Sequence, residues 1–100
     1  MPEVTILIAV RDYGQYLSNA LDSALAQTIP SHQFEVLVVD DGSTDATPDV
    51  LQSYQGRIRT IRQPPEGLPA ACNLGVEAAR GEYLIRLDAD DALEPTALTE

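Results

Sequence analysis

Lysine is absent from this 100-residue sequence, and its basic residues are six arginines against 16 aspartates and glutamates. The formal net charge of −10 disfavours a protein that binds nucleic acid or an anionic membrane, because such proteins need a basic face. The missing lysine also excludes a P-loop, whose motif requires that residue. Phosphates would have to be met by a metal ion, an arginine or backbone N–H groups.

Cysteine and long apolar runs are scarce as well. Cys72 is the single cysteine, so no disulfide can form within the chain, which favours the cytoplasm. The first apolar run, at residues 4–10, is short, follows Glu3 and has no basic flank, unlike a signal peptide. Nothing approaches the length of a membrane span. The sequence therefore predicts a cytoplasmic chain without a membrane span.

Apolar residues make up 44% of the sequence, enough for the core of one small domain. Their periodicity alternates between that of strands and that of amphipathic helices. The expected strands lie at residues 4–10, 34–39, 57–62 and 83–87. The expected helices lie at residues 17–25, 47–54 and 69–80, and a last one starts at Glu94.

Three strand–helix–strand units with short connections predict a mainly parallel sheet with right-handed crossovers. The fold class is α/β, a three-layer doubly wound (Rossmann-like) half with strand order 3-2-1-4. The segment 57–62 alternates charged and apolar residues, which predicts an edge strand whose single wet face carries Arg57, Arg59 and Arg62.

Three carboxylates follow the last predicted strand directly. Side chains alternate along an extended backbone, so Asp88 and Asp90 can point to the same side, with Asp91 adjacent. Hard oxygen ligands at this spacing suit Mn²⁺ or Mg²⁺, whose shell is completed by water and substrate phosphates. The alternative is a solvated acidic turn, because two unit charges about 4 Å apart repel by only about 1 kcal/mol in water.

A second acidic strand end occurs at Asp40 and Asp41, which precede Gly42 and Ser43. Ligands of open α/β sheets bind beyond the carboxyl ends of the strands, so two acidic ends suggest one shared site. The alternative here is turn and cap chemistry, for which aspartate, glycine and serine are favoured.

Other functional classes fit the spacing less well. An EF-hand would need glycine and glutamate where the sequence has Leu93 and Thr99. A receiver-type signalling module would place its acid pair after the first strand and use a late lysine. A dinucleotide-dependent oxidoreductase would need Gly-x-Gly-x-x-Gly after the first strand. A nucleotidyltransferase and a non-catalytic nucleotide-binding module remain open alternatives.

The order and spacing of several motifs resemble the family 2 glycosyltransferases of the GT-A fold, over essentially the whole sequence. The matching segments are residues 4–10, Leu25-Ala26-Gln27-Thr28, Val38-Val39-Asp40-Asp41-Gly42-Ser43-Thr44-Asp45, residues 67–75, residues 79–83 and Leu87-Asp88-Ala89-Asp90-Asp91. These segments in this order are together highly specific, although single ones occur by chance. The resemblance implies that residues 1–100 are the nucleotide-sugar-binding part of a glycosyltransferase.

The resemblance also assigns residues to the nucleotide. In the family, the carboxylate corresponding to Asp41 accepts a hydrogen bond from the base, usually uracil, and Asp40 sits beside it. The loop after the first strand lines the nucleoside pocket, and the segment 67–73 approaches it. The residues expected at the nucleotide are Ala9, Arg11, Asp12, Asp40, Asp41, Asn73 and Asp88. A UDP-sugar is the favoured donor.

The Asp-x-Asp (DXD) motif of the family holds a metal on the diphosphate, which implies Mn²⁺ or Mg²⁺ on Asp88 and Asp90 with Asp91 adjacent. Two departures from the family pattern stand out. Residues 9–12 replace the usual Pro-x-Tyr-Asn, so that Tyr13 or Arg11 could replace the tyrosine that stacks on the base. Cys72 replaces a usual arginine. The family's general base lies in the acceptor-binding half, so it is expected beyond Glu100.

These features predict a chain that binds a nucleotide sugar and transfers it poorly by itself to an acceptor that the sequence does not identify. The last predicted strand has an open flank, where the acceptor-binding half would pair. Exposed strand edges promote association, so a homo-oligomer through this edge is expected.

Overall fold

The computed structural model describes residues 2–28 and 30–88. Within these residues one sheet is formed by four strands, which are β1 (Val4–Val10), β2 (Phe34–Asp40), β3 (Arg59–Arg62) and β4 (Tyr83–Arg86). The helices are α1 (Gly14–Leu25), the short 3₁₀ helix η1 (Ser31–Gln33), α2 (Thr47–Ser53) and α3 (Leu68–Ala78). Strands and helices alternate as the periodicity predicts.

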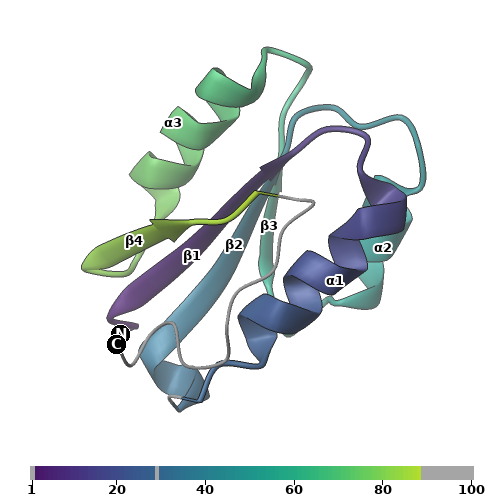
Figure 1. Cartoon of the computed structure of the whole chain (residues 1–100). Coiled ribbons are helices and arrows are strands. Elements are labelled where there is room, and N and C mark those ends of the chain that lie inside the picture. Colours follow the sequence, from purple (N-terminus) through teal and green to yellow (C-terminus); the bar gives the residue numbers. More distant parts are fainter. Residues whose placement is uncertain (1, 29, 89–100) are drawn as a thin grey trace.

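The strand order is β3-β2-β1-β4, and each neighbouring pair is parallel, which confirms the predicted topology. β1 lies between β2 and β4, so the first strand is central, as expected for a strand that is apolar along nearly its whole length. Helix α3 covers one face of the sheet, and α1 and α2 cover the other (Figure 1). The three-layer α/β architecture is therefore confirmed.

The core divides into two apolar clusters, one on each face of the sheet, because strand side chains alternate between faces. Ile6 and Ile8 of β1 pack with Leu17 and Leu21 of α1 in the larger cluster. Leu7 lies in the smaller cluster beneath α3. A Cβ on Gly75 would lie 2.3 Å from Leu7 Cδ1, so glycine is what allows α3 to approach the sheet this closely.

The structure corrects the prediction for the edge strand. β3 begins at Arg59 rather than Arg57, and its arginines do not share one wet face. Arg59 forms an ion pair with Glu35 and donates to Ala78 O of α3 at 3.0 Å, whereas Arg62 pairs with Asp40 on the side of α2. Residues three apart in a strand point to opposite faces, which the alternating charge pattern did not reveal.

Two further details concern the end of the chain. Helix α3 ends at Ala78, two residues before the predicted end at Arg80. The predicted helix that starts at Glu94 lies outside the described residues. Within residues 2–28 and 30–88, no helix is both long and apolar enough to cross a membrane.

Candidate functional site

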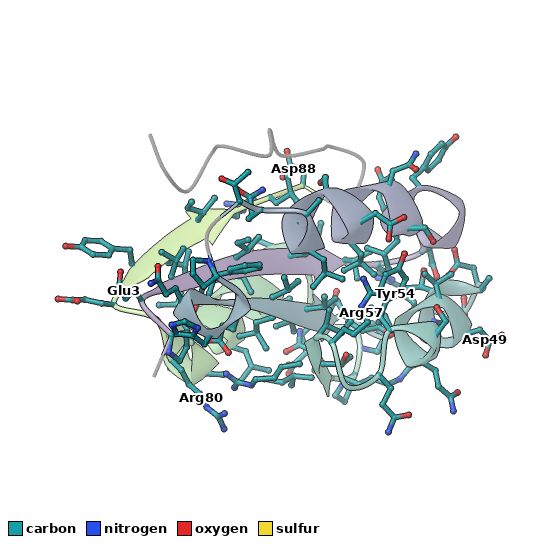
Figure 2. The ribbon with its side chains drawn as sticks, turned by 90° about the horizontal axis from the view of Figure 1, so that it is seen from below. Glu3, Asp49, Tyr54, Arg57, Arg80 and Asp88 are labelled. Atoms are coloured by element: carbon teal, nitrogen blue, oxygen red, sulfur yellow. The ribbon has the colours of Figure 1, made fainter. Side chains whose placement is uncertain are left out.

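The two acidic strand ends leave the sheet at the same edge, namely the one formed by the carboxyl ends of the strands, because β2 and β4 both run parallel to β1. In the register of the sheet, Asp40 lies opposite Val10, and Arg86 lies opposite Leu7 on the other side of β1. Asp88 follows two residues later and is exposed (Figure 2). Asp40 ends β2 on one side of β1, and Asp88 follows β4 on the other side.

Asp40 is 1% exposed, and both of its carboxylate oxygens are engaged. Oδ1 accepts a hydrogen bond from the Ser43 backbone N–H at 2.9 Å, and Oδ2 accepts one from Arg62 Nη1 at 2.8 Å. Arg62 Nη2 also donates to Ser43 O at 2.8 Å. Asp40 therefore closes the turn after β2 and joins that turn to β3.

Asp41 is fully buried and binds the loop at residues 63–67. Its Oδ1 accepts hydrogen bonds from the Glu66 N–H at 2.8 Å and from Gln63 Nε2 at 2.7 Å, and its Oδ2 accepts one from the Gly67 N–H at 2.9 Å. The bonds from Glu66 and Gln63 are the main reasons that the pKa of Asp41 is lowered, and Arg11 adds to the effect. Asp41 is thus a charged anchor for the segment that leads into α3.

The same loop packs tightly on the turn after β2. Gly42 has a φ of +74°, in the left-handed region that favours glycine. A Cβ at this position would also lie 2.6 Å from Pro65 Cδ. Position 42 therefore requires glycine for two reasons, the backbone conformation of the turn and the close contact with the loop.

A second group of hydrogen bonds joins the loop after β1 to the loop after β2. Asp12, with a φ of +56°, donates its N–H to Ser43 Oγ at 2.9 Å, and its Oδ1 accepts from the N–H groups of Thr44 and Asp45 at 2.8 and 3.2 Å. Asp45 in turn accepts from the Gly14 N–H at 3.1 Å. The two loops form one connected wall at the edge of the sheet.

Asp45 also binds the start of α2. Its Oδ1 accepts a hydrogen bond from the Thr47 N–H at 2.8 Å, and Thr47 Oγ1 accepts one from the Tyr13 N–H at 3.2 Å. The hydroxyl of Thr47, followed by its backbone N–H, lowers the pKa of Asp45. Asp45 thereby satisfies one of the orphan N–H groups at this helix start, and the Thr47 hydroxyl joins the helix start to the loop after β1.

The remaining residues that were predicted for the site lie in different surroundings. Ala9 packs against the core beneath α3, and Arg11 is exposed close enough to Asp41 to affect its pKa. Asn73 is exposed on α3, and within the described residues no hydrogen bond joins it to the other predicted residues. Asp90 and Asp91 lie outside the described residues. The structure thus brings Arg11, Asp12, Asp40 and Asp41 together, with Asp88 two residues beyond the end of β4.

Sequence reasoning missed several residues that build this edge. Ser43, Asp45 and Arg62 hold the turn and the loops in place, and Gln63 binds Asp41. Ser43 and Asp45 belong to the turn motif that the sequence already singled out. Gln63 directly follows β3, so the rule that ligands bind beyond strand ends could have indicated it.

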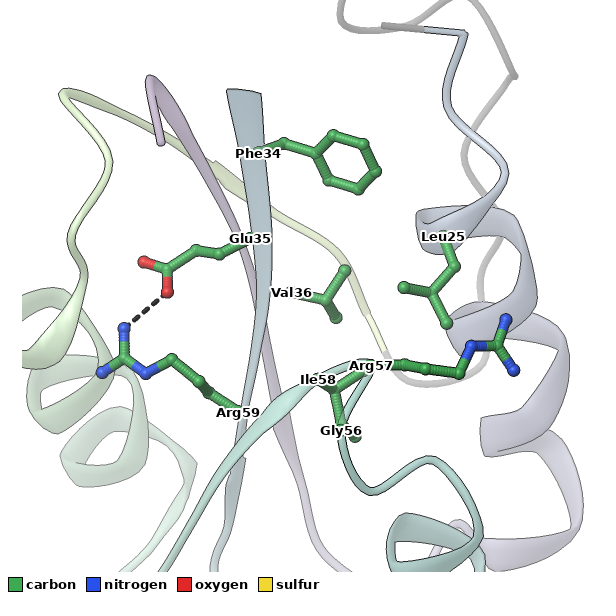
Figure 3. A pocket seen from close by; sticks show the side chains of 8 residues that line it. All are labelled: Leu25, Phe34, Glu35, Val36, Gly56, Arg57, Ile58 and Arg59. Carbon is green, nitrogen blue, oxygen red and sulfur yellow. Dashed lines mark hydrogen bonds and ion pairs between the residues drawn. The ribbon is translucent and has the colours of Figure 1, made fainter. Parts of the chain in front are cut away.

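Two cavities formed by the described residues lie mostly away from the candidate site. The larger one, about 570 Å³, lies at the amino ends of β2 and β3, where Leu25, Phe34, Val36 and Ile58 line it (Figure 3). The second, about 460 Å³, lies against α2 and reaches only Asp40 and Arg62 of the residues above. The loops that follow β1, β2 and β3 line neither of these two cavities.

Only some of the residues predicted to bind a metal ion lie in the described part of the chain. Among residues 2–28 and 30–88, no group of three or more histidine, cysteine, aspartate or glutamate side chains could hold an ion. Asp88 is the one predicted ligand in that part of the chain. Its exposed carboxylate at the strand end has the hard oxygen donors that Mn²⁺ and Mg²⁺ prefer.

Comparison with known proteins gives one consistent answer. The family model described as Glycosyl transferase family 2 matches residues 5–100. A chondroitin synthase of Escherichia coli is 41% identical over 101 residues, which cover 98% of this chain and 14% of that protein.

Solved structures agree. The structure of S. aureus TarS 1–349 in complex with UDP superposes with a TM-score of 0.85 at 26% identity, over 99% of this chain and 30% of that one. The mannosyltransferase PcManGT from Pyrobaculum calidifontis in complex with GDP-Man and Mn²⁺ has a TM-score of 0.83 at 27% identity, over 98% and 30%. This chain spans less than a third of the length of each of these three proteins.

Proposed function

This chain belongs to glycosyl transferase family 2, and from that premise we propose that residues 1–100 form the donor-binding part of a glycosyltransferase. The donor is a nucleoside-diphosphate sugar, bound at the carboxyl ends of β1, β2 and β4. The observation that carries the proposal is the convergence of the loops after β1, β2 and β3 on the edge where Asp88 also leaves the sheet. Similar structures have been solved with UDP and with GDP-Man and Mn²⁺, which supports a nucleotide at this edge.

In this proposal the residues of the edge have different tasks. Asp12, Asp40 and Asp41 shape the nucleotide pocket, because their oxygens already accept hydrogen bonds from the surrounding loops. Arg11 offers the exposed cation beside Asp41. Ala9 at the end of β1 and Asn73 on α3 border the nucleotide on the side of α3.

Mn²⁺ or Mg²⁺ would be held by Asp88 and Asp90, with Asp91 adjacent. When bound, the ion neutralises charge that develops on the departing diphosphate. Catalysis additionally requires a base that deprotonates the acceptor hydroxyl. That base is expected beyond Glu100, so we expect residues 1–100 alone to bind the donor without efficient transfer.

Calorimetric titration with UDP, with and without MnCl₂, tests the proposal. We expect UDP to bind and Mn²⁺ to strengthen the affinity at least about 10-fold, an effect that Asp90→Ala abolishes. Asp49→Ala is the matched control, because Asp49 is an exposed acid on α2 that Figure 2 shows well apart from Asp88. Absence of binding to both UDP and GDP would contradict the donor-binding function. Equal loss in the two variants would contradict the metal assignment.

We also propose that the chain self-associates through β4. Among the described residues β4 pairs only with β1, and Tyr83 and Leu84 are 65% and 39% exposed. An unpaired strand edge with apolar side chains favours pairing with another copy. Sedimentation velocity over a wide concentration range should show a dimer, and a Leu84→Lys variant should stay monomeric. A wild-type chain that is monomeric throughout would contradict this proposal.

A further inference from the structure

We propose that the cavity at the amino ends of β2 and β3 binds an extended peptide segment of a partner protein, which adds to β2 as a further strand. The segment that fits carries acidic side chains beside an apolar one. The cavity has a volume of about 570 Å³, a size typical of ligand sites. It lies at the opposite end of the sheet from the proposed donor site, so the inference does not depend on the proposed function.

β2 is longer than the strand that pairs with it on this side. It pairs with β1 along its whole length, whereas β3 begins at Arg59, opposite Leu37. Among the described residues, no strand therefore pairs with residues 34–36 on the side of β3, and we call these three residues the free stretch of β2. The chain arrives at β3 from α2 through a turn at Gly56, which has a φ of +90°, and the cavity lies between this turn and the free stretch.

The backbone of the free stretch is oriented for pairing with a further strand. Asp40 O accepts a hydrogen bond from the Gln63 N–H, on the side of β3. The hydrogen-bonding direction alternates from one residue of a strand to the next, so Phe34 and Val36 point their backbone groups to the same side as Asp40. A segment in the cavity can pair with the backbone groups that β3 leaves free, and such pairing is a common way to bind an extended peptide.

The two faces of the free stretch differ in polarity. The wall on the side of α1 is apolar and consists of Leu25, Phe34, Val36 and Ile58 (Figure 3). Glu35 points to the other face, where it forms an ion pair with Arg59. An extended segment places alternate side chains on the two faces, so one apolar side chain would pack against the wall on the side of α1.

The charge of the cavity favours an acidic segment. Two arginines and one glutamate line it, on a chain whose formal net charge is −10. Arg59 is paired with Glu35, whereas no carboxylate among the described residues forms an ion pair with the exposed Arg57. Arg57 extends to the same side as the apolar wall (Figure 3). Residues two apart in an extended segment share a face, so an acidic residue two positions from an apolar one fits.

Calorimetric titration with the blocked pentapeptide acetyl-Glu-Thr-Val-Thr-Glu-amide tests the inference. An acid lies two positions from the valine on either side, so the peptide can meet Arg57 in either direction along β2. We expect saturable binding that weakens about 5-fold in Arg57→Glu, because attraction at the surface becomes repulsion. The same peptide with lysine in place of glutamate should instead prefer the variant. Arg86→Glu is the matched control, because Arg86 is an exposed arginine of β4, the other edge strand of the described sheet, and it should keep the wild-type affinity.

Methylation of the peptide backbone separates strand addition from non-specific contact. Methyl groups on the two threonine nitrogens and a methyl group on the valine nitrogen remove N–H groups from opposite sides of an extended peptide. Only one of the two methylated peptides should lose affinity, by at least about 10-fold, because only one row of N–H groups faces β2.

Several results would overturn the inference. These are no binding of the pentapeptide to wild type, equal affinities of the two methylated peptides, and a loss of affinity in Arg86→Glu instead of Arg57→Glu. Tighter binding of octanoate, which has an apolar tail and a carboxylate without a peptide backbone, would assign the cavity to a small apolar anion and also overturn it. If Arg57→Glu does not fold, the methylated peptides decide on wild type alone. Titration with UDP measures donor binding separately.

Discussion

At the amino end of the sheet, one carboxylate accepts hydrogen bonds mainly from side chains of strands. At the carboxyl end, by contrast, four carboxylates accept hydrogen bonds mostly from backbone N–H groups of loops. Glu35 of β2 accepts hydrogen bonds from Thr5 of β1, Arg59 of β3 and the Arg80 N–H before β4. We call these four residues, with Gly81, whose N–H donates to Thr5, the amino-end network.

The carboxyl-end network consists of Asp12, Asp40, Asp41 and Asp45 with the loops that they bind. These loops have little regular structure, so their shape depends on the carboxylates rather than on a ladder of hydrogen bonds. The difference indicates that the amino-end network mainly supports the stability of the sheet, while the carboxyl-end network mainly sets the shape of the candidate site. Substitutions at the two ends should therefore separate stability from nucleotide binding.

The largest effect is expected for Glu35→Ala. The loss of the carboxylate leaves the Thr5 hydroxyl and Arg59 Nη1 without their acceptor in a partly buried position, although Arg59 Nη2 keeps its bond to Ala78 O. We expect the free energy of unfolding to fall by about 3 kcal/mol. Urea denaturation measures this change, with the exposed Glu77→Ala on α3 as the control. The affinity for UDP, measured where the variant is folded, should stay near that of wild type. A loss of affinity as large as the loss of stability would contradict the separation of the two ends.

A smaller effect is expected for Gly42→Ala at the carboxyl end. It places a side chain at positive φ and against Pro65, and we expect a loss of about 2 kcal/mol. Gly56→Ala is the matched control, because Gly56 has a φ of +90° and a Cβ there would contact nothing within 4 Å. Gly56→Ala should lose only about 1 kcal/mol and leave UDP binding unchanged. If Gly42→Ala bound UDP as wild type does, the shape of the loop would not matter for binding.

The two networks should also differ in their dependence on pH. Despite burial, hydrogen bonds from Thr5, the Arg80 N–H and Arg59 hold the pKa of Glu35 below 4.5, and the hydroxyl and N–H of Thr47 hold that of Asp45 below 3.8. Each carboxylate therefore stabilises the fold fully above its unfolded pKa, and this stabilisation is lost as the pH falls through the folded pKa.

The contribution of Glu35 should already be falling at pH 4.5 and that of Asp45 at pH 3.8, the values at which the unfolded carboxyl groups are half protonated. Urea denaturation at a series of pH values tests this order. In a plot of the free energy of unfolding against pH, Glu35→Gln should reduce the slope from about pH 4.5 downwards. Asp45→Asn should reduce it only from about pH 3.8 downwards. Identical curves for the two variants would show that neither carboxylate is coupled to folding as described.

The smallest effect is expected for Arg57→Met near the amino-end cavity (Figure 3). The guanidinium lies 5.4 Å from the centroid of the Tyr54 ring, a cation–π contact of about 0.5 kcal/mol at an exposed position. Methionine keeps much of the aliphatic stem and removes the charge. Thermal unfolding should shift slightly, and in Tyr54→Phe the same substitution should have a similar effect, because the ring remains. A change in UDP affinity would link this end of the sheet to the candidate site.

Local sequence patterns predicted the fold well because they depend on neighbours in the chain. The apolar runs at residues 4–10 and 34–39 identified the central strands, and the alternation with helices gave the sheet order. The faces of the arginines could not be read this way. They depend on where β3 begins, and that start is fixed by pairing with β2, in which Arg59 lies opposite Leu37.

The acids at strand ends could be found from sequence, but their partners could not. Asp41 is distinguished by position alone, and nothing local shows that residues 63–67 supply all three of its hydrogen bonds. The role of Gln63 depends on the same long-range contact. Asp12 could be named as a loop residue, whereas its left-handed backbone follows from its bonds to Ser43 and Thr44.

The central position of β1 has a consequence for how the chain folds while it is being synthesised. β1 is made first, yet one of its two neighbours is β4, whose Tyr83 pairs with Val4 near the other end of the described chain. One side of this very apolar strand therefore stays unpaired on the ribosome until β4 has emerged. Distant pairing of this kind slows folding and leaves a nascent strand open to misassembly or to capture by a chaperone.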